Sequence, residues 1–481
     1  MPNLKSLFKD TAIYGLSSIV GRFLNYLLVP LYSYKMAAAS GDYGIVTNVY
    51  SYTALLLVLL TFGMETTFFR FVNKEEENPE RVYSTTLIAV AAVGLMFIAA
   101  VLCFLPTVAG WMGYAATPQY VGVMAVVVAL DAFQAIPFAY LRYQRKPLKF
   151  AGLKLLFIFL NIILNLIYFL GVDKPDVGFV FYINLVCTAA ITFFFYRELT
   201  GFRWVVDGKL LRRMLSYAWP LVILGVAGIL NQTADKILYP IVRGGQEGKV
   251  ELGIYGACVK VAMIMAMITQ AFRYAYEPFV FAGSKDKDSR EMYAKAMKYF
   301  IAFTLLAFLV VMGYIDILKH IIGPDYWEGL RVIPVVMVAE IMMGVYFNLS
   351  FWYKLTDRTI WGALLSGTGC LVLIVTNILF IPTYHYMACA WAGVAGYGTA
   401  MVLSYFAGQH YFPIKYPLKG IAAYVLVAAL FYAVMQFVPA SWPLVARLAI
   451  NTVLILAFIG HILYHDLPPR GLPFVGKYFK K

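Results

Sequence analysis

The chain has 481 residues, of which 62% are hydrophobic and 13% are charged, and its formal net charge is +14. Soluble domains are nearer 45–50% apolar and about 25% charged. The composition therefore excludes a soluble globular protein and predicts a membrane protein that crosses the bilayer many times. Five cysteines are scattered through apolar segments without a C-x-x-C spacing, which argues against disulfides and against a metal site.

Apolar segments bounded by charged residues, proline or glycine predict the transmembrane helices in chain order. The first apolar run is longer than the roughly 7–15 residues of a signal-peptide core and holds Arg22 in its middle, so we interpret it as a helix that is not cleaved. The sequence thus predicts an all-α polytopic membrane protein with about 14 transmembrane helices. The predicted segments are 11–34, 43–69, 82–105, 118–141, 150–171, 177–196, 214–241, 252–282, 296–315, 328–353, 359–382, 386–409, 420–438 and 442–464.

The distribution of lysine and arginine predicts the orientation in the membrane. Basic residues are about four times as frequent in the set of alternate connections that contains both termini as in the opposite set. The positive-inside rule therefore places both termini in the cytoplasm, and the basic excess is a topology signal that does not support nucleic-acid binding. The predicted outer connections are too short to hold a folded catalytic domain.

An internal repeat relates two parts of the chain at an offset of 212 residues. Tyr43-Gly44 recurs as Tyr255-Gly256, and Glu65 recurs as Glu277. A repeat in the same direction predicts two six-helix lobes related by an axis along the membrane normal. The predicted division is an N-terminal lobe at 1–200, a second lobe at 201–415, and two extra helices with a cytoplasmic tail at 416–481.

Polar and charged residues interrupt the hairpin at 220–282, which is otherwise apolar. A charge near the bilayer centre costs roughly 2.5–3.5 kcal/mol on insertion scales, so several charges there predict a protein-lined, wet cavity. These residues are Asn231, Asp235, Lys236, Lys260, Arg273 and Glu277.

Three intramembrane cations are candidates for binding an anionic substrate group in that cavity. Arg22 lies midway along the first predicted helix, and arginine presents a planar fork of donors that suits phosphate oxygens. Arg273 and Lys260 lie on different faces of the eighth predicted helix, because 13 residues separate them. The alternative for each is a structural ion pair, which for Arg22 would be with Asp131 or Glu340.

A second set of residues is predicted to serve gating or ion coupling, or else to lock helices together. Asp131 and Glu340 are mid-helix carboxyls that could carry a proton. Asn231 and Asp235 share a helix face, whereas the adjacent Asp235 and Lys236 are expected to point in different directions. The complete set is Asp131, Asn231, Asp235, Lys236 and Glu340.

Acids near the predicted cytoplasmic helix ends are interpreted as salt-bridge clasps. Glu65 and Glu277 are expected to bind Arg70 and other bases of the inner connections. The five histidines lie at helix ends or in loops, and the chain has no P-loop, H-E-x-x-H or G-x-S-x-G motif. These features predict no catalytic residue, no metal and no cofactor.

Several short motifs resemble those of bacterial polysaccharide flippases in the multidrug/oligosaccharidyl-lipid/polysaccharide exporter superfamily. They are K-D-T-A-I-Y-G-L-S-S-I-V-G-R-F at 9–23, G-D-Y-G at 41–44, G-M-E-T-T-F-F-R-F at 63–71, N-x-x-x-D-K at 231–236, G-I-Y-G-A-x-x-K at 253–260 and Q-A-F-R-Y-A-Y-E-P-F at 270–279. The resemblance covers the whole chain. Lys236 departs from the Asp-Arg pair that this family more often has.

The resemblance implies a transporter of the bacterial inner membrane that works by alternating access and has no enzymatic activity. Its substrate would be an oligosaccharide on an undecaprenyl diphosphate carrier, moved to the periplasmic leaflet for surface polysaccharide synthesis, including that of lipopolysaccharide. The implied partners are that lipid-linked oligosaccharide, membrane lipids, and the polymerase and glycosyltransferases of the same pathway. The alternatives are a multidrug or cation antiporter of the same fold, a lipid II flippase and a membrane glycan polymerase.

Overall fold

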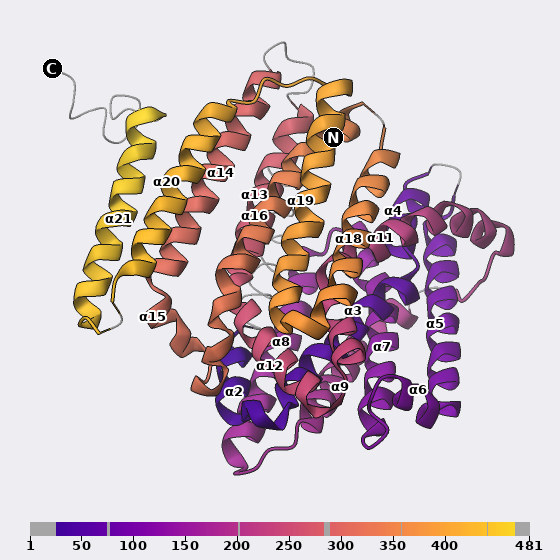
Figure 1. Cartoon of the computed structure of the whole chain (residues 1–481). Coiled ribbons are helices and arrows are strands. Elements are labelled where there is room, and N and C mark those ends of the chain that lie inside the picture. Colours follow the sequence, from indigo (N-terminus) through magenta and orange to yellow (C-terminus); the bar gives the residue numbers. More distant parts are fainter. Residues whose placement is uncertain are drawn as a thin grey trace. The chain divides into compact units, whose positions relative to one another are not determined.

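The computed structural model of the chain describes residues 26–74, 77–200, 203–282, 289–356, 358–439 and 441–466, without the side chains at 274, 275, 277–279, 281 and 282. Every regular element within these ranges is a helix, which confirms the predicted all-α class. The elements, shown in Figure 1, are α2 (Leu28–Lys35), η1 (Ala38–Ser40), α3 (Asp42–Thr61), α4 (Met64–Val72), α5 (Pro79–Cys103), α6 (Leu105–Trp111), α7 (Pro118–Tyr143), α8 (Pro147–Gly171), α9 (Gly178–Phe193), α10 (Tyr196–Thr200), α11 (Gly208–Arg243), α12 (Gly245–Ala262), α13 (Ile264–Ala282), α14 (Ser289–Gly313), α15 (Ile315–Leu318), η2 (Lys319–Ile321), η3 (Pro324–Val332), α16 (Ile333–Leu349), α17 (Phe351–Leu355), α18 (Ile360–Tyr384), α19 (Tyr386–Tyr411), α20 (Leu418–Phe437) and α21 (Leu444–His465).

The described helices include 11 that are long and apolar enough to cross a membrane, or up to 12 if α12 and α13 form one span bent by 42°. The predicted count of fourteen is therefore not confirmed. When α12 and α13 are counted as one span, two of the predicted segments account for the difference. Most of the segment 11–34 lies outside the described residues, and α9 has only 16 residues, which at 1.5 Å each is shorter than the roughly 30 Å hydrocarbon core.

Local sequence explains where the helices begin and end. Asn78 caps α5 because its side-chain oxygen accepts hydrogen bonds from the backbone N–H groups of Glu80 and Arg81. Asp207 caps α11 in the same way. Between α3 and α4, Phe62 and Gly63 have φ angles of 48° and 64°, a left-handed conformation that a helix cannot continue through.

The chain divides into two compact units. The first comprises residues 1–257 and 369–392, and the second comprises 258–368 and 393–481. This division does not follow the predicted lobe boundaries at 200 and 415, and the lobes themselves stay a prediction.

Aromatic packing fixes α4, α5 and α7 against one another in the first unit. Phe68 of α4 and Tyr83 of α5 are fully buried. The Tyr83 ring stacks on Tyr140 of α7 with 4.0 Å between ring centroids, and Phe68 meets both rings edge-on. This cluster sets the position of α7, which carries the candidate site described below.

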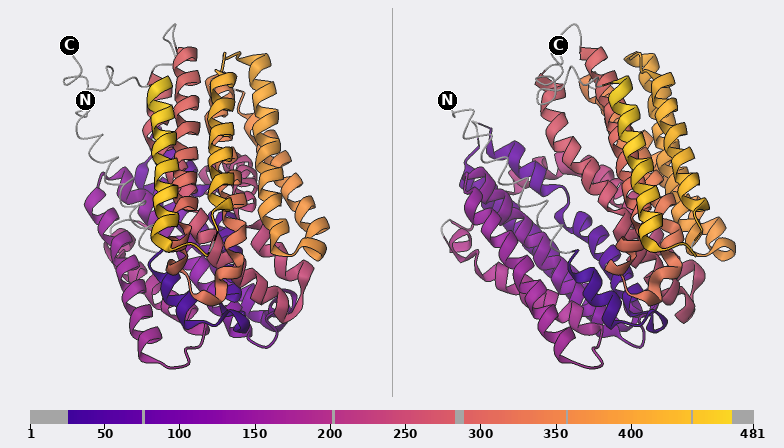
Figure 2. Two further views of the ribbon diagram at one scale, coloured as in Figure 1. Left: turned by 60° about the vertical axis from the view of Figure 1, so that its left-hand side comes forward. Right: turned by 90° about the vertical axis from the view of Figure 1, so that its left-hand side faces the viewer.

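Polar contacts hold the C-terminal helix α21 to α14 at both ends in the second unit, where these helices and α20 lie side by side (Figures 1 and 2). At one end Asp466 binds Lys298 of α14 and accepts a hydrogen bond from Tyr424 of α20. At the other end Arg447 is 2.6 Å from Asp316 of the adjoining α15, and Asn451 donates to the carbonyl of Gly313, the last residue of α14, at 2.8 Å. The C-terminal pair is thus attached to this unit by directed bonds as well as by apolar packing.

Replacing Asp466 with asparagine is expected to lower the melting temperature of the purified protein at pH 7. Burial raises the pKa of the Asp466 carboxyl, but hydrogen bonds from Lys298 and Tyr424 outweigh this and leave the pKa below its ordinary value. Because the pKa of this carboxyl is lower in the folded protein than in the unfolded chain, where it is near 4, the ionised carboxyl stabilises the fold at higher pH. This contribution is lost as the pH falls through the pKa of the folded state. The difference in melting temperature between the two proteins should therefore be largest at pH 7 and shrink below about pH 4. Equal melting temperatures at pH 7 would show that the contact contributes nothing.

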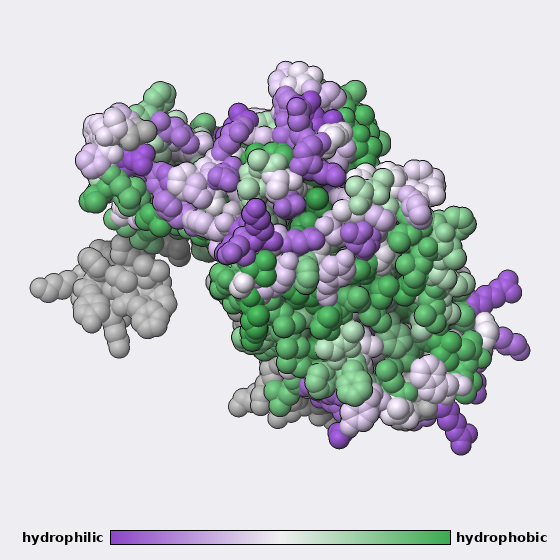
Figure 3. Space-filling model, turned by 90° about the horizontal axis from the view of Figure 1, so that it is seen from below, coloured by the Kyte–Doolittle hydropathy of each residue, from purple (hydrophilic) through white to green (hydrophobic). Residues whose placement is uncertain are grey.

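Large hydrophobic side chains are exposed along most of the long helices. Figure 3 shows them covering broad, continuous areas of the face that it displays. Soluble proteins rarely expose apolar patches larger than a few hundred Å². These surfaces are those of a multi-pass membrane protein in contact with lipid.

Candidate functional site

One face of α7 carries charged and aromatic side chains within a membrane span. Asp131, Phe138 and Arg142 are 7 and 4 residues apart, so they lie nearly in line along the helix. From Asp131 to Arg142 the line extends about 16 Å. Helices α3, α4, α8 and α9 of the same unit pack against α7.

Arg142 at the end of this line forms an ion pair with Glu65 of α4. Its guanidinium also lies 4.8 Å from the centroid of the Phe69 ring. The side chains of Arg142 and Glu65 are 32% and 44% exposed, so a ligand in contact with water could reach both. The expected partner of Glu65 was Arg70, but Glu65 pairs with Arg142 instead, and the Arg70 guanidinium lies over the Tyr217 ring at 3.9 Å.

Lys154 of α8 faces the middle of the same line. It lies 7 residues into α8, about 10 Å along the helix, and its side chain is exposed. Its ammonium lies 4.0 Å from the centroid of the Phe138 ring. Within the described ranges it makes no hydrogen bond or ion pair, although Asp131 and Glu65 attract it electrostatically. A lysine at this depth is costly unless it meets water or an anion.

Asp131 is held by a chain of hydroxyl and amide groups. The Thr188 hydroxyl of α9 is 3.4 Å from an Asp131 oxygen and 3.3 Å from the side-chain oxygen of Asn184. Asn184 in turn donates a hydrogen bond to the Tyr50 hydroxyl of α3 at 2.7 Å. Gln134 donates to the Thr188 carbonyl at 2.8 Å. This network orients the carboxyl of Asp131 without neutralising it.

Asp235 and Lys236 of α11 form a second charged group in the first unit. The Lys236 ammonium lies 3.0 Å from both carboxylate oxygens of Asp235, and the Tyr255 hydroxyl donates to Asp235 at 2.7 Å. The expectation that the two adjacent side chains point apart is wrong, because the long, flexible lysine side chain folds back onto its neighbour. Asn48 of α3 donates to the Lys236 carbonyl at 2.8 Å and ties this group to α3.

The other predicted site residues lie at separate places. Asn231 donates to the Ala227 carbonyl of its own helix at 3.0 Å. The Arg273 guanidinium lies over the Phe347 ring at 4.2 Å. Lys260 in α12 and Glu340 in α16 are partly buried. Arg22 and the side chain of Glu277 lie outside the described residues.

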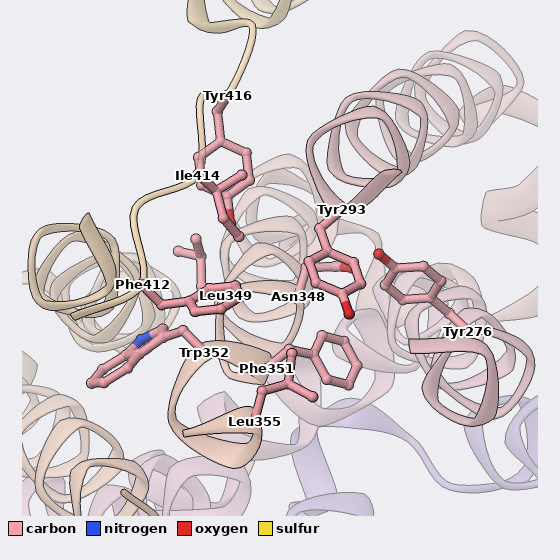
Figure 4. Close-up of a pocket in the computed structure, with 10 residues that line it drawn as sticks. All are labelled: Tyr276, Tyr293, Asn348, Leu349, Phe351, Trp352, Leu355, Phe412, Ile414 and Tyr416. Atoms are coloured by element: carbon pink, nitrogen blue, oxygen red, sulfur yellow. The ribbon is translucent and has the colours of Figure 1, made fainter. Parts of the chain in front are cut away.

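A small pocket in the second unit is lined mainly by aromatic rings (Figure 4). It has room for about one water molecule, which excludes a sugar ring in this conformation. A buried side-chain oxygen of Asn348, which has no hydrogen-bond partner in the described part of the chain, offers such a water an acceptor. The lining residues are Tyr276, Tyr293, Asn348, Leu349, Phe351, Trp352, Leu355, Phe412, Ile414 and Tyr416.

No metal site is found in the described residues, where no group of three or more His, Cys, Asp or Glu side chains is arranged to hold an ion. Lys154 and Arg142 are not among the site residues predicted from the sequence. Lys154 could have been found, because a lysine inside a predicted span is itself a signal. The predicted segment 118–141 ends just before Arg142, whereas α7 continues through Arg142 to Tyr143.

The chain belongs to the polysaccharide biosynthesis protein family, whose model matches residues 7–281. No curated protein sequence matches the chain.

Its fold is similar to that of solved membrane transporters. A lipid II flippase, MurJ, in an inward closed conformation is 14% identical, with a TM-score of 0.75 over 94% of this chain and 99% of that one. An inward-facing multidrug resistance MATE transporter of the MOP superfamily is 15% identical, with a TM-score of 0.67 over 84% and 95% of the two chains. The MATE multidrug transporter DinF-BH is 15% identical, with a TM-score of 0.58 over 84% and 96%. The protein therefore has the MurJ- and MATE-like fold.

Proposed function

We propose that this protein flips a lipid-linked oligosaccharide across the bacterial inner membrane during the synthesis of a surface polysaccharide. The carrier would be undecaprenyl diphosphate, and the movement would run from the cytoplasmic to the periplasmic leaflet. The single observation that carries the proposal is that the charged line of α7, with Lys154 of α8 beside it, presents an exposed and a partly exposed cation inside the spans of a polysaccharide biosynthesis protein.

The chemistry of that line suits an anionic headgroup. A diphosphate offers several oxygens to a lysine or arginine, and charge-assisted hydrogen bonds of this kind are about twice as strong as neutral ones. Moving the headgroup across the bilayer makes and breaks no covalent bond, so the proposal is of a transporter without enzymatic activity. The predicted cations Arg22, Lys260 and Arg273 are proposed as further contacts along the path.

The remaining roles follow from the same proposal. Asp131, Asn231, Asp235, Lys236 and Glu340 are proposed to serve gating or ion coupling. Both termini are proposed to lie in the cytoplasm, and the glycosyltransferases and polymerase of the pathway are proposed as partners. The likeness to a lipid II flippase makes lipid II the second candidate substrate.

Cells that lack this protein are expected to lose surface polysaccharide and to accumulate the lipid-linked precursor in the cytoplasmic leaflet. Surface polysaccharide is measured by immunoblotting, and precursor by mass spectrometry of extracted lipid. Complementation with the unmodified chain should restore both, and complementation with Arg22→Ala or Arg273→Ala should not. Normal surface polysaccharide in the deleted strain would contradict the proposal. Normal export by both variants at normal protein levels would contradict the roles of those two arginines.

A further inference from the structure

We infer that Lys154 is the contact for a phosphate oxygen of the lipid headgroup, and that Asp131 weakens this contact so that the headgroup can leave. The inference rests on the proposed function and adds to it the residue that meets the charge and the residue that limits the affinity. Both lie in the first unit, on α8 and α7.

The surroundings of Lys154 favour an anion. The side chain is exposed although it lies inside a span, and the Phe138 ring supports the ammonium from one side at 4.0 Å. The other basic side chain at this site, Arg142, already has a carboxylate partner in Glu65. An incoming phosphate can therefore bind Lys154 without first breaking an ion pair with any described residue.

Asp131 supplies the opposing charge. Its carboxyl attracts Lys154 but forms no salt bridge with it in the described part of the chain. A phosphate bound to Lys154 would feel the repulsion of Asp131, reduced by the hydroxyl of Thr188 on α9. The other charged or titratable groups that face this position are Tyr50 on α3, Glu65 on α4 and Arg142 on α7.

A transport site needs this balance between attraction and repulsion. Conduction through a membrane requires binding that is favourable enough for entry and weak enough for release. Without a nearby carboxylate, nothing would oppose the attraction between the lysine and a diphosphate, and release of the headgroup would be slower. Removing the charge of Lys154 and removing that of Asp131 are therefore expected to change the affinity for the headgroup in opposite directions.

The test measures binding of farnesyl diphosphate to the full chain in nanodiscs by isothermal titration calorimetry. Lys154→Gln is expected to weaken binding by roughly tenfold to a hundredfold, the worth of one charge-assisted hydrogen bond. Lys154→Arg should stay within a few-fold of the unmodified protein, because the charge is kept. Asp131→Asn is expected to tighten binding by roughly threefold to tenfold, because it removes a like charge.

Matched controls separate the site from general electrostatics. Lys209→Gln removes an exposed cation at the start of α11 and should leave the affinity unchanged. Farnesol, which lacks the diphosphate, should not respond to any of the charge changes. Inorganic pyrophosphate should respond with the same signs if the headgroup alone is bound, and binding of pyrophosphate as tight as that of farnesyl diphosphate would identify a free anion as the ligand and overturn the lipid headgroup.

Two outcomes would overturn the inference while leaving the proposed function standing. Unchanged affinity in Lys154→Gln, with a melting temperature equal to that of Lys154→Arg, would place the headgroup elsewhere. Weaker binding in Asp131→Asn would show that the carboxylate assists the ligand instead of opposing it. Absence of binding to the unmodified chain would also count against the inference, whereas the proposed function is tested separately by export in cells.

Discussion

Replacing Gly44 with alanine is expected to destabilise the protein by about 3 kcal/mol, at the upper end of the cost of overpacking. A Cβ atom at Gly44 would lie 1.9 Å from the carbonyl oxygen of Lys249 and 3.0 Å from the backbone nitrogen of Gly253. Both atoms belong to the backbone of α12, so no side-chain rotation can relieve the clash. The helices α3 and α12 would have to move apart.

Gly152→Ala is the matched control for this prediction. Gly152 also lies inside a helix, α8, but an added Cβ there would meet nothing within 4 Å. Alanine is the better helix former, so this change is expected to stabilise by about 1 kcal/mol. Melting temperatures in one detergent compare the two variants. A Gly44→Ala protein as stable as Gly152→Ala would show that the contact with α12 does not exist.

Replacing Lys149 with methionine is expected to cost about 3 kcal/mol, because it leaves a buried carboxylate without its partner. The side chain of Glu198 on α10 is 4% exposed, and the Lys149 ammonium lies 2.8 and 2.6 Å from its two oxygens. The backbone carbonyl of Glu198 also accepts a hydrogen bond from the Tyr83 hydroxyl at 3.1 Å. The ion pair therefore ties α8 and α10 to the aromatic cluster of α5.

The double variant Lys149→Met with Glu198→Gln provides the control. Removing both charges relieves the desolvation penalty, so the double variant should recover much of the stability that the single one loses. Thermal unfolding at pH 7 measures all three proteins. If the single and double variants melt at the same temperature, water reaches Glu198 and the ion pair contributes little.

The sequence predicted the helices better than the contacts between them. Apolar runs bounded by proline and charge indicated segments such as 118–141 and 386–409, close to α7 and α19, because a span has a fixed minimal length. Hydropathy could not show that α9 is short or that α12 and α13 meet at a bend. Such features depend on what the helix packs against.

The repeat identified the two Tyr-Gly pairs, and the structure shows what these positions contact. An added Cβ at Gly256 would lie 2.5 Å from the Thr47 hydroxyl of α3, while Gly44 of α3 meets α12. The two Tyr-Gly pairs therefore lie in one reciprocal crossing, where small residues let the helix backbones approach closely. The repeat showed the spacing of these pairs but not the contact between them.

Charged site residues were the hardest to predict. Helical geometry separates Asp235 from Lys236, but a lysine has enough rotatable bonds to reach its neighbour. Glu65 was matched to the nearby Arg70, whereas its partner is 77 residues away. Which charges pair and which stay available, as Lys154 does among the described residues, is decided by tertiary packing that a single sequence does not contain.

The most direct test of the proposed function is movement of a labelled undecaprenyl diphosphate oligosaccharide across liposomes that contain the purified protein. The fraction of label accessible to an impermeant enzyme outside the vesicle gives the rate. We expect movement that depends on the protein and that slows about tenfold or more in Lys154→Gln. No movement beyond that in protein-free liposomes, or equal movement of a zwitterionic phospholipid, would contradict the proposed function.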